Sequence, residues 1–223
     1  MIRAVVLAAV FLSGAALMSL EMAGFRLVQP EFGSDIIVWG SLISVFLGGL
    51  AIGAFLGGRL ADRRPALWKL GAILALGGVV ALSIPLYSDA ALDYMFPGEG
   101  APLPEEWGAG GTGAVGQLVV YMPPDLRWPT LGVGALLFLV PSVLLGMVTP
   151  YAAKLLIHAL GHLGAGVGKI SGLSTAGAIV GTLGTTFYLI TWMGTRWLLA
   201  ANGLVLVGLG LALALVHLAT PRE

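Results

Sequence analysis

A glutamate and an arginine stand at the far end of the first apolar stretch of this chain. Glu21 follows fifteen almost wholly apolar residues, Ala4 to Met18, and Arg26 lies five residues further on. An ionisable side chain inside a membrane span is costly unless it is paired or wet, so it marks a candidate binding residue. Five positions turn a helix by roughly 140°, so the two side chains do not share one face. Glu21 and Arg26 are therefore separate candidate substrate-binding residues.

Two roles fit Glu21. Seventeen residues beyond Ala4, at about 1.5 Å each, place it about 25 Å across a hydrocarbon core of about 30 Å. At that depth it can contact a cationic ligand in an outward vestibule, or it can form the polar lip of a structural helix. Residue type and depth do not separate the two roles.

Other residue types argue against catalysis. His158 and His162 have the i, i+4 spacing of a metal-binding pair, but no third ligand lies nearby in the sequence. We favour the interpretation that these two histidines lie at the membrane interface near a helix end, and we expect no bound metal. The chain has no cysteine, no Ser/His/Asp arrangement and no pair of carboxylates on one apolar helix face. We expect no catalytic residue, no cofactor and no enzymatic activity.

The composition is that of an integral membrane protein. The chain is 58% hydrophobic and 10% charged, whereas a soluble domain is about 25% charged. Its formal charge is zero and it has no basic run, which excludes nucleic acid as an expected partner. The expected partner is the lipid bilayer.

Long apolar segments predict six membrane helices. Each is long enough for a core that needs about 20 helical residues. They cover approximately residues 4–29, 36–58, 67–86, 130–157, 166–191 and 196–218. The first segment also resembles a signal peptide, with Arg3 before an apolar run and small residues at Ser13 to Ala16. Because the apolar stretch continues past that point, we favour an uncleaved helix.

Lysine and arginine residues orient these helices. With both termini in the cytoplasm, eight of the eleven basic residues lie inside and three outside, as the positive-inside rule requires. The long segment 87–129 then lies outside, where six acidic residues face one arginine. This outer loop is rich in glycine and proline, with a short helix predicted over 90–96 and no nucleotide-binding motif.

Glycine spacing predicts close helix packing and an internal repeat. Gly49, Gly53 and Gly57 recur every four residues in one segment, and Gly177, Gly181 and Thr185 have the same spacing in another. Such ridges let helix backbones approach closely in lipid. An offset of 128 residues carries the first ridge onto the second, and also carries Arg26 onto Lys154. Each half would hold three helices. Because three is an odd number of crossings, the second copy enters the membrane in the opposite orientation to the first.

Three stretches carry a resemblance to a known family. The stretch 19–64, "SLEMAGFRLVQPEFGSDIIVWGSLISVFLGGLAIGAFLGGRLADRR", resembles the membrane domain of the spermidine synthase-like membrane proteins, also called fused facilitator/spermidine synthase proteins. "LLGMVTPYAAKLL" (144–156) and "GKISGLSTAGAIVGTLGTTFYL" (168–189) are similar to its second half. The resemblance covers most of the chain outside the outer loop.

The resemblance implies a gate and an indirect link to polyamines. "GRLADRR" (58–64) resembles the loop between helices 2 and 3 of the major facilitator superfamily, where an aspartate and basic residues hold a cytoplasmic gate. Asp62, Arg63 and Lys154 are the candidate gate residues, and Lys154 is expected to snorkel to the interface or to pair with Asp62. The alternative is that Asp62 and its arginines only anchor the helix end. Many relatives also carry a cytoplasmic aminopropyltransferase domain, which we do not expect in this polypeptide.

The sequence therefore predicts an all-α integral membrane fold resembling half of a facilitator. A single transmembrane domain, 1–223, holds repeat 1 (about 4–86), the outer loop (about 87–129) and repeat 2 (about 130–218). We expect it in the cell inner membrane, with both termini cytoplasmic. The leading hypothesis is a transport or substrate-channelling module for a small cation such as a polyamine, alongside a separate aminopropyltransferase. The other hypothesis is a non-catalytic scaffold subunit in a homodimer or a larger membrane complex.

Polar residues predicted near the membrane midplane are few and uncharged: Ser13, Ser44, Thr175 and Thr182. A proton-coupled or sodium-coupled pump normally has an acid at that depth. This weakens a coupled-transport hypothesis.

Overall fold

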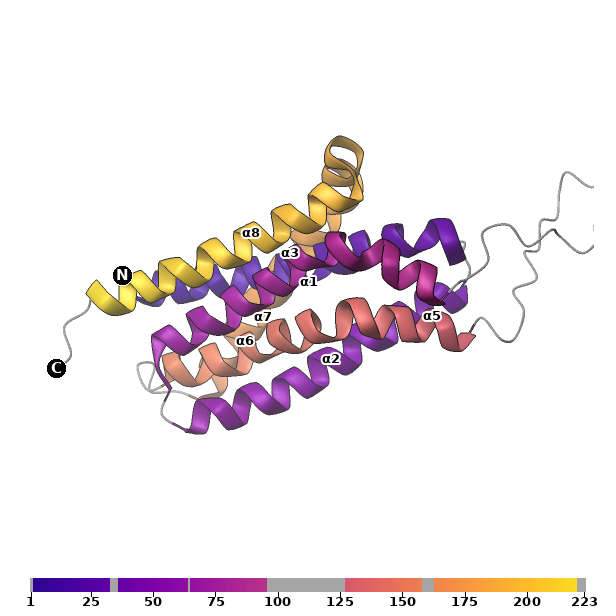
Figure 1. Ribbon diagram of the computed structural model, residues 1–223. Helices are drawn as coiled ribbons and strands as arrows, with labels where there is room; N and C mark the ends of the chain where they lie inside the picture. The colour runs from indigo at the N-terminus through magenta and orange to yellow at the C-terminus, as the bar shows by residue number, and fades with distance from the viewer. Residues whose placement is uncertain (1, 33–35, 64, 96–126, 158–162, 220–223) are drawn as a thin grey trace, which may run out of the picture.

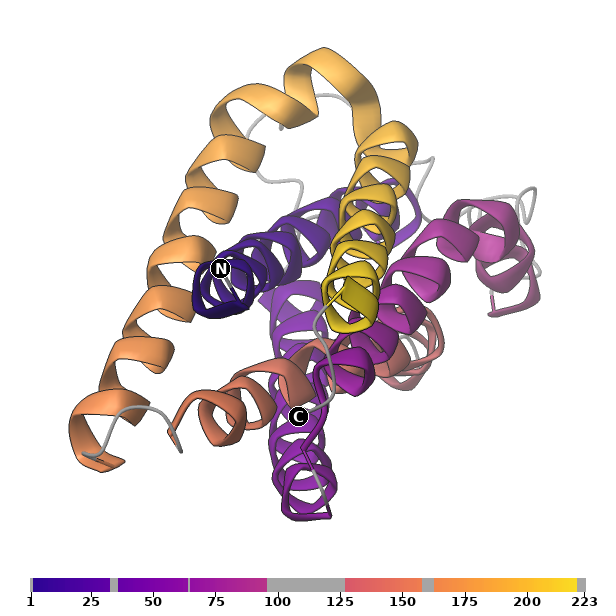
Figure 2. The same ribbon diagram turned by 90° about the vertical axis from the view of Figure 1, so that its left-hand side faces the viewer.

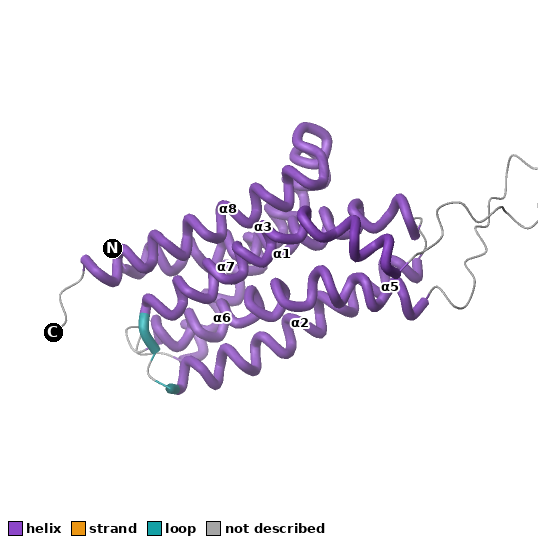
Figure 3. The backbone as a smooth tube through the Cα atoms, in the orientation of Figure 1, coloured by secondary structure: helices purple, strands orange, loops and turns teal. Residues whose placement is uncertain are grey.

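A computed structural model describes residues 2–32, 36–63, 65–95, 127–157 and 163–219, and every regular element in these ranges is a helix (Figure 1, Figure 3). The first half contains α1 (Ile2–Phe32), α2 (Ile36–Asp62) and α3 (Leu67–Met95). The second half contains α5 (Arg127–Gly134), the π-helix η2 (Ala135–Leu139), α6 (Val140–Ile157), α7 (Leu163–Gly184), the π-helix η3 (Thr185–Leu189) and α8 (Ile190–Ala219).

Five helices of the described chain are long and apolar enough to cross a membrane. They are Ile2–Pro30, Ile36–Asp62, Leu67–Tyr94, Trp128–Leu156 and Gly166–Ala219, with mean hydropathies between 2.0 and 2.4. This confirms the predicted class, a helical multi-pass membrane protein. The last stretch is 54 residues long, which at about 1.5 Å per residue exceeds the thickness of a hydrocarbon core more than twofold.

That last stretch is broken at Gly194. Its backbone has φ 71° and ψ 163°, a conformation essentially restricted to glycine, and it is non-helical within α8. Figure 2 shows the consequence: orange α7 and yellow α8 lie on opposite sides of indigo α1, and the chain between them forms an arch. The predicted segments 166–191 and 196–218 lie on either side of this break.

The predicted end of the third helix, residue 86, is wrong. The helix continues to Met95, so the predicted outer loop does not begin at Tyr87, and the short helix predicted over 90–96 is largely the end of α3. Ala91 and Leu92 are buried, and Asp89 forms an ion pair with Arg196 of α8. These tertiary contacts extend the helix past the point where apolar residues become sparse. Residues 96–126, which hold most of the acidic loop, lie outside the described residues.

The predicted glycine ridge of α2 forms the contact between α2 and α6. A Cβ atom on Gly53 would overlap the carbonyl oxygen of Val143, and one on Gly57 would lie 2.6 Å from the Cα of Met147. Without side chains, the two backbones come together where lipid offers no hydrophobic driving force and dispersion contacts must stabilise the pair. Residue numbers rise together along this contact, so α2 and α6 run parallel.

The second ridge joins α7 to α1 in the same way. A Cβ atom on Gly177 would overlap the carbonyl oxygen of Phe11, and one on Gly181 that of Ala15. These two helices also run parallel. By contrast, α3 and α8 are antiparallel, because Gly71 meets Gly210 while Gly78 meets Gly203. These three pairs are the most extensive helix contacts of the described chain.

The ridge contact makes a prediction for Gly53. We expect Gly53→Ala to lower the free energy of unfolding by about 1–3 kcal/mol, because an added methyl group forces the α2 and α6 backbones apart. Gly48→Ala is the matched control, since a Cβ atom at Gly48 meets nothing within 4 Å. Thermal unfolding in detergent would measure both, and equal midpoints for the two variants would contradict the packing account.

The backbone at Gly194 makes a second prediction. Alanine cannot adopt this conformation without strain, so Gly194→Ala is expected to cost about 1–3 kcal/mol in folding free energy. Gly184→Ala is its control, because Gly184 is helical (φ −60°, ψ −43°) and has open space at its Cβ position. Denaturant or thermal titration of the two variants would test this. A Gly194→Ala protein as stable as the control would mean that the arch does not depend on glycine.

Candidate functional site

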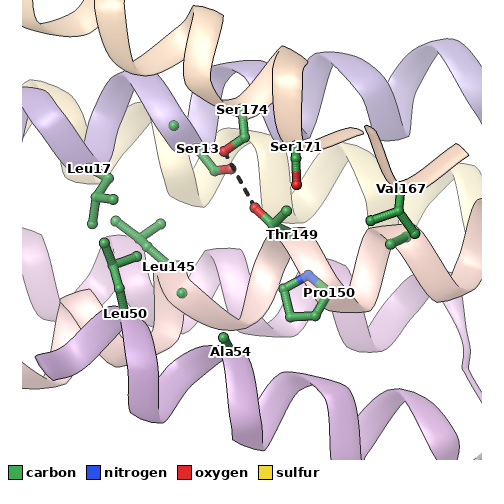
Figure 4. A pocket seen from close by; sticks show the side chains of 13 residues that line it. Ser13, Leu17, Leu50, Ala54, Leu145, Thr149, Pro150, Val167, Ser171 and Ser174 are labelled. Carbon is green, nitrogen blue, oxygen red and sulfur yellow. Dashed lines mark hydrogen bonds between the residues drawn. The ribbon is translucent and has the colours of Figure 1, made fainter. Parts of the chain in front are cut away.

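A groove with a volume of about 330 Å³ lies among α1, α2, α6 and α7 (Figure 4). Leu17, Leu50 and Leu145 form its apolar side, and four hydroxyl groups contribute polar atoms. The groove is lined by Ser13, Gly14, Leu17, Leu50, Ala54, Leu145, Gly146, Thr149, Pro150, Ala153, Val167, Ser171 and Ser174. It therefore draws on two helices from each half of the chain.

The hydroxyl groups come together because α1 and α7 pack closely here. A Cβ atom on Gly14 would overlap the carbonyl oxygen of Ser174, so the α7 backbone lies directly against α1. The Thr149 hydroxyl donates to Ser174 Oγ over 3.4 Å, and the Ser13 hydroxyl donates to the carbonyl of Val10 over 3.0 Å. Ser171 is exposed at the same groove.

Pro150 leaves one backbone carbonyl beside the groove without its usual helix donor. Proline has no backbone N–H, so it cannot donate to the carbonyl four residues earlier, which belongs to Gly146. Gly146 also lines the groove. Hydroxyl oxygens and a carbonyl freed from the helix ladder together suit a ligand that donates hydrogen bonds.

Among the described residues, no charged side chain lines the groove. Its thirteen lining residues are apolar, glycine, proline, serine or threonine. Within the described ranges there is also no group of three or more metal-ligating side chains. The chemistry that this arrangement supports is hydrogen bonding to a small polar or cationic solute.

Glu21 and Arg26 lie apart from this groove. Glu21 is half-buried in α1 and lines neither the hydroxyl groove nor either of the two hollows described below. Arg26 is exposed and lines a separate hollow of about 470 Å³, together with Pro30, Asp89 and Arg196. The structure does not bring these two candidate residues into one site.

The Asp89–Arg196 ion pair was not predicted. Arg196 donates from one guanidinium nitrogen to both carboxylate oxygens of Asp89, over 2.5 and 2.6 Å. Both side chains are more than half exposed, so the pair contributes little to stability. The two residues lie 107 positions apart, and no local spacing signals such a pair.

The candidate gate residues Asp62 and Lys154 form an ion pair, with 2.7 Å between Lys154 Nζ and Asp62 Oδ1. This is one of the two placements expected for Lys154. Beside it, the hydroxyl of buried Tyr151 accepts a hydrogen bond from the Ala66 amide and donates one to the Ala66 carbonyl. The α2–α3 connection is thereby held against α6. Arg63 is exposed, and its carbonyl accepts a hydrogen bond from Lys69.

A buried polar cluster, separate from the hydroxyl groove, joins α1 to the second half of the chain. The side chains of Thr185 and Asn202 both donate to Ser19 Oγ, over 2.7 and 2.8 Å. These three residues line a hollow of about 410 Å³ together with Gly181 and Tyr188. Thr185, the first residue of η3, continues the glycine ridge of α7, and spacing predicted this position. Ser19 and Asn202 were not singled out.

The remaining candidates have local roles or fall outside the described residues. The hydroxyls of Ser44, Thr175 and Thr182 each donate to the carbonyl four residues earlier in their own helix. The pair His158 and His162 lies outside the described residues. Of the predicted midplane hydroxyls, Ser13 alone lines the groove.

Comparison with known proteins identifies no relative: the chain matches no family model, no curated protein and no solved structure.

Proposed function

We propose that this chain is a transport or substrate-channelling module that takes a small cation such as a polyamine into its hydroxyl groove. The observation that carries the proposal is the groove itself, a hollow inside a bundle of membrane-spanning helices that is lined by Ser13, Thr149, Ser171 and Ser174. Ammonium groups donate hydrogen bonds to hydroxyl and carbonyl oxygens, and the leucine walls suit the methylene segments between them.

The same proposal treats the two halves as inverted repeats, because their contacts correspond. Adding 128 to each number carries Gly49, Gly53 and Gly57 onto Gly177, Gly181 and Thr185. Their partners correspond too: Phe11, Ala15 and Ser19 map onto Leu139, Val143 and Met147. The α1–α7 contact and the α2–α6 contact therefore use corresponding positions, which supports the proposed repeat. Transporters with inverted repeats bind their substrates between the repeats, near the midplane.

We further propose six crossings, with the 54-residue stretch crossing twice about Gly194. Exposed aromatic side chains at the end of the molecule near Gly194 support a membrane interface there. These residues are Tyr94, Trp128, Tyr188, Trp192 and Trp197. The opposite end gathers basic residues, among them Arg59, Arg63 and Lys154, which supports its placement in the cytoplasm of a cell with this protein in its inner membrane.

The polyamine is proposed from the sequence resemblance to the spermidine synthase-like membrane proteins. In this proposal the chain performs no aminopropyl transfer, and a separate aminopropyltransferase supplies or consumes the polyamine. Asp62, Arg63 and Lys154 close the cytoplasmic end of the α2–α6 pair, and the Asp62–Lys154 contact supports that role.

A scaffold subunit is the alternative, and the outer surface of α7 favours it. Added Cβ atoms at Gly164, Gly168 and Gly172 would meet nothing within 4 Å, and Ser171 and Thr175 are exposed on the same helix. Small outward residues of this kind suit close packing of another membrane helix, from a second copy or from another subunit. The predicted ridges at Gly53 and Gly181, however, pack inside the chain.

Calorimetric titration of the purified protein with spermidine tests the proposed function. Removing two groove hydroxyls in Thr149→Val with Ser174→Ala is expected to weaken binding about tenfold or more, because hydrogen bonds to charged groups contribute about 1.5–3 kcal/mol each. Ser44→Ala is the control, since its hydroxyl bonds its own helix and lies outside the groove. A wild-type protein without spermidine binding, or a double variant that binds equally well, would contradict the proposal.

A further inference from the structure

The groove has a counterpart in the first half of the chain that is closed. Under the 128-residue correspondence, Thr149, Ala153 and Val167 of the groove map onto Glu21, Phe25 and Trp39. Thr149 and Ala153 belong to α6 and Val167 to α7, whereas their counterparts Glu21 and Phe25 belong to α1 and Trp39 to α2. The correspondence therefore relates an open hollow to a position where α1 and α2 are in contact.

Side-chain size explains why one position is open and the other closed. Phe25 and Trp39 stack with ring centroids 3.8 Å apart and an interplanar angle of 22°. In the groove, the same two positions hold alanine and valine, which leave the space between α6 and α7 unfilled. Ser174 of the groove likewise corresponds to Phe46, which is 1% exposed and stacks on Phe138.

Chemistry distinguishes the two positions as well. Thr149 presents a hydroxyl group to the groove, whereas its counterpart Glu21 presents a carboxylate. Within the described residues Glu21 takes part in no ion pair, although it lies inside the apolar span Ile2–Pro30. A carboxylate at that depth calls for a cation or for water.

We infer that Glu21 belongs to a second cation subsite, between α1 and α2, and that the stacked Phe25–Trp39 pair is its gate. The subsite takes an ammonium group, which donates hydrogen bonds to the carboxylate and neutralises its charge. This inference rests on the proposed function for its ligand, and on the paired contacts of the two halves for its geometry. In this conformation the hydroxyl groove is open and the Glu21 subsite is closed, the arrangement expected of two halves that open alternately around a bound solute.

Cysteine labelling tests the gate without any polyamine. The chain has no native cysteine, so Thr149→Cys and Glu21→Cys each provide one reporter thiol. The protein is held in lipid nanodiscs, where both faces are accessible, and reacted with a charged, membrane-impermeant methanethiosulfonate. We expect the thiol at position 149 to react faster than the thiol at position 21, because position 149 borders the open groove, whereas a closed gate would keep the reagent from position 21.

Removing the gate should reverse this protection. Adding Phe25→Ala to the Glu21→Cys protein is expected to raise its labelling rate about fivefold to tenfold. The loss of one aromatic pair increases the population of the open state by about this factor. Phe55→Ala is the matched control, because Phe55 is an exposed phenylalanine on α2 that lines neither position. An unchanged rate in the Phe25→Ala protein, or equal rates at positions 21 and 149 in the unaltered background, would overturn the inference.

A reciprocal variant covers the case in which Phe25→Ala fails to fold. Ala153→Phe with Val167→Trp installs the aromatic pair at the open groove and should slow labelling of Thr149→Cys by a similar factor. An unchanged labelling rate of Thr149→Cys in this variant would also contradict the inference that the aromatic pair is a gate. If these rates change as expected while spermidine does not bind, the gate stands and the proposed substrate is wrong.

Discussion

Close approach of helix backbones at glycine is the constraint on which the rest of this structure depends. Where Gly53 meets Val143 and Gly181 meets Ala15, no side chain separates the two helices. Lipid supplies no hydrophobic driving force between helices, so dispersion contacts over bare backbone must provide the attraction. These contacts fix the parallel pairs α2–α6 and α1–α7, and the hydroxyl groove lies among the same four helices. A wider spacing of these helices would move Thr149 away from Ser174, and the hydroxyl groups would no longer line one groove.

Two further interactions complete this framework at the ends of the helices. At one end, Tyr151 and the Asp62–Lys154 pair hold the α2–α3 connection on α6. At the other end, Gly194 turns the chain back so that α8 can pack antiparallel to α3. The ion pair is exposed and stabilises little by itself, whereas the buried tyrosine satisfies both backbone groups of Ala66. The hydrogen bonds of Tyr151 therefore contribute more than the ion pair to the position of this connection.

The sequence predicted the helical membrane class, the approximate positions of the apolar helices and the glycine ridges, because these depend on local composition and spacing. It could not predict which helix each ridge would contact, since Gly53 and Val143 are far apart in the chain. The end of α3 was misplaced because Ala91 and Leu92 are buried by tertiary packing and not by lipid. Glu21 was placed at a depth, but depth does not tell which neighbours a side chain faces. Ser13 was singled out as a midplane hydroxyl and Thr149 was not, and the two contribute to one site only because α1, α6 and α7 come together.

The central claim is that the two halves traverse the membrane in opposite senses, so that the groove and the Glu21 subsite face opposite sides. Single cysteines at Lys169, Trp192 and His217 test it most directly, through labelling with an impermeant maleimide in intact and permeabilised cells. The account predicts that Trp192→Cys is labelled in intact cells, while Lys169→Cys and His217→Cys are labelled only after permeabilisation. Labelling of Lys169→Cys and His217→Cys from opposite sides would mean that the chain crosses once between them, which would contradict the inverted arrangement.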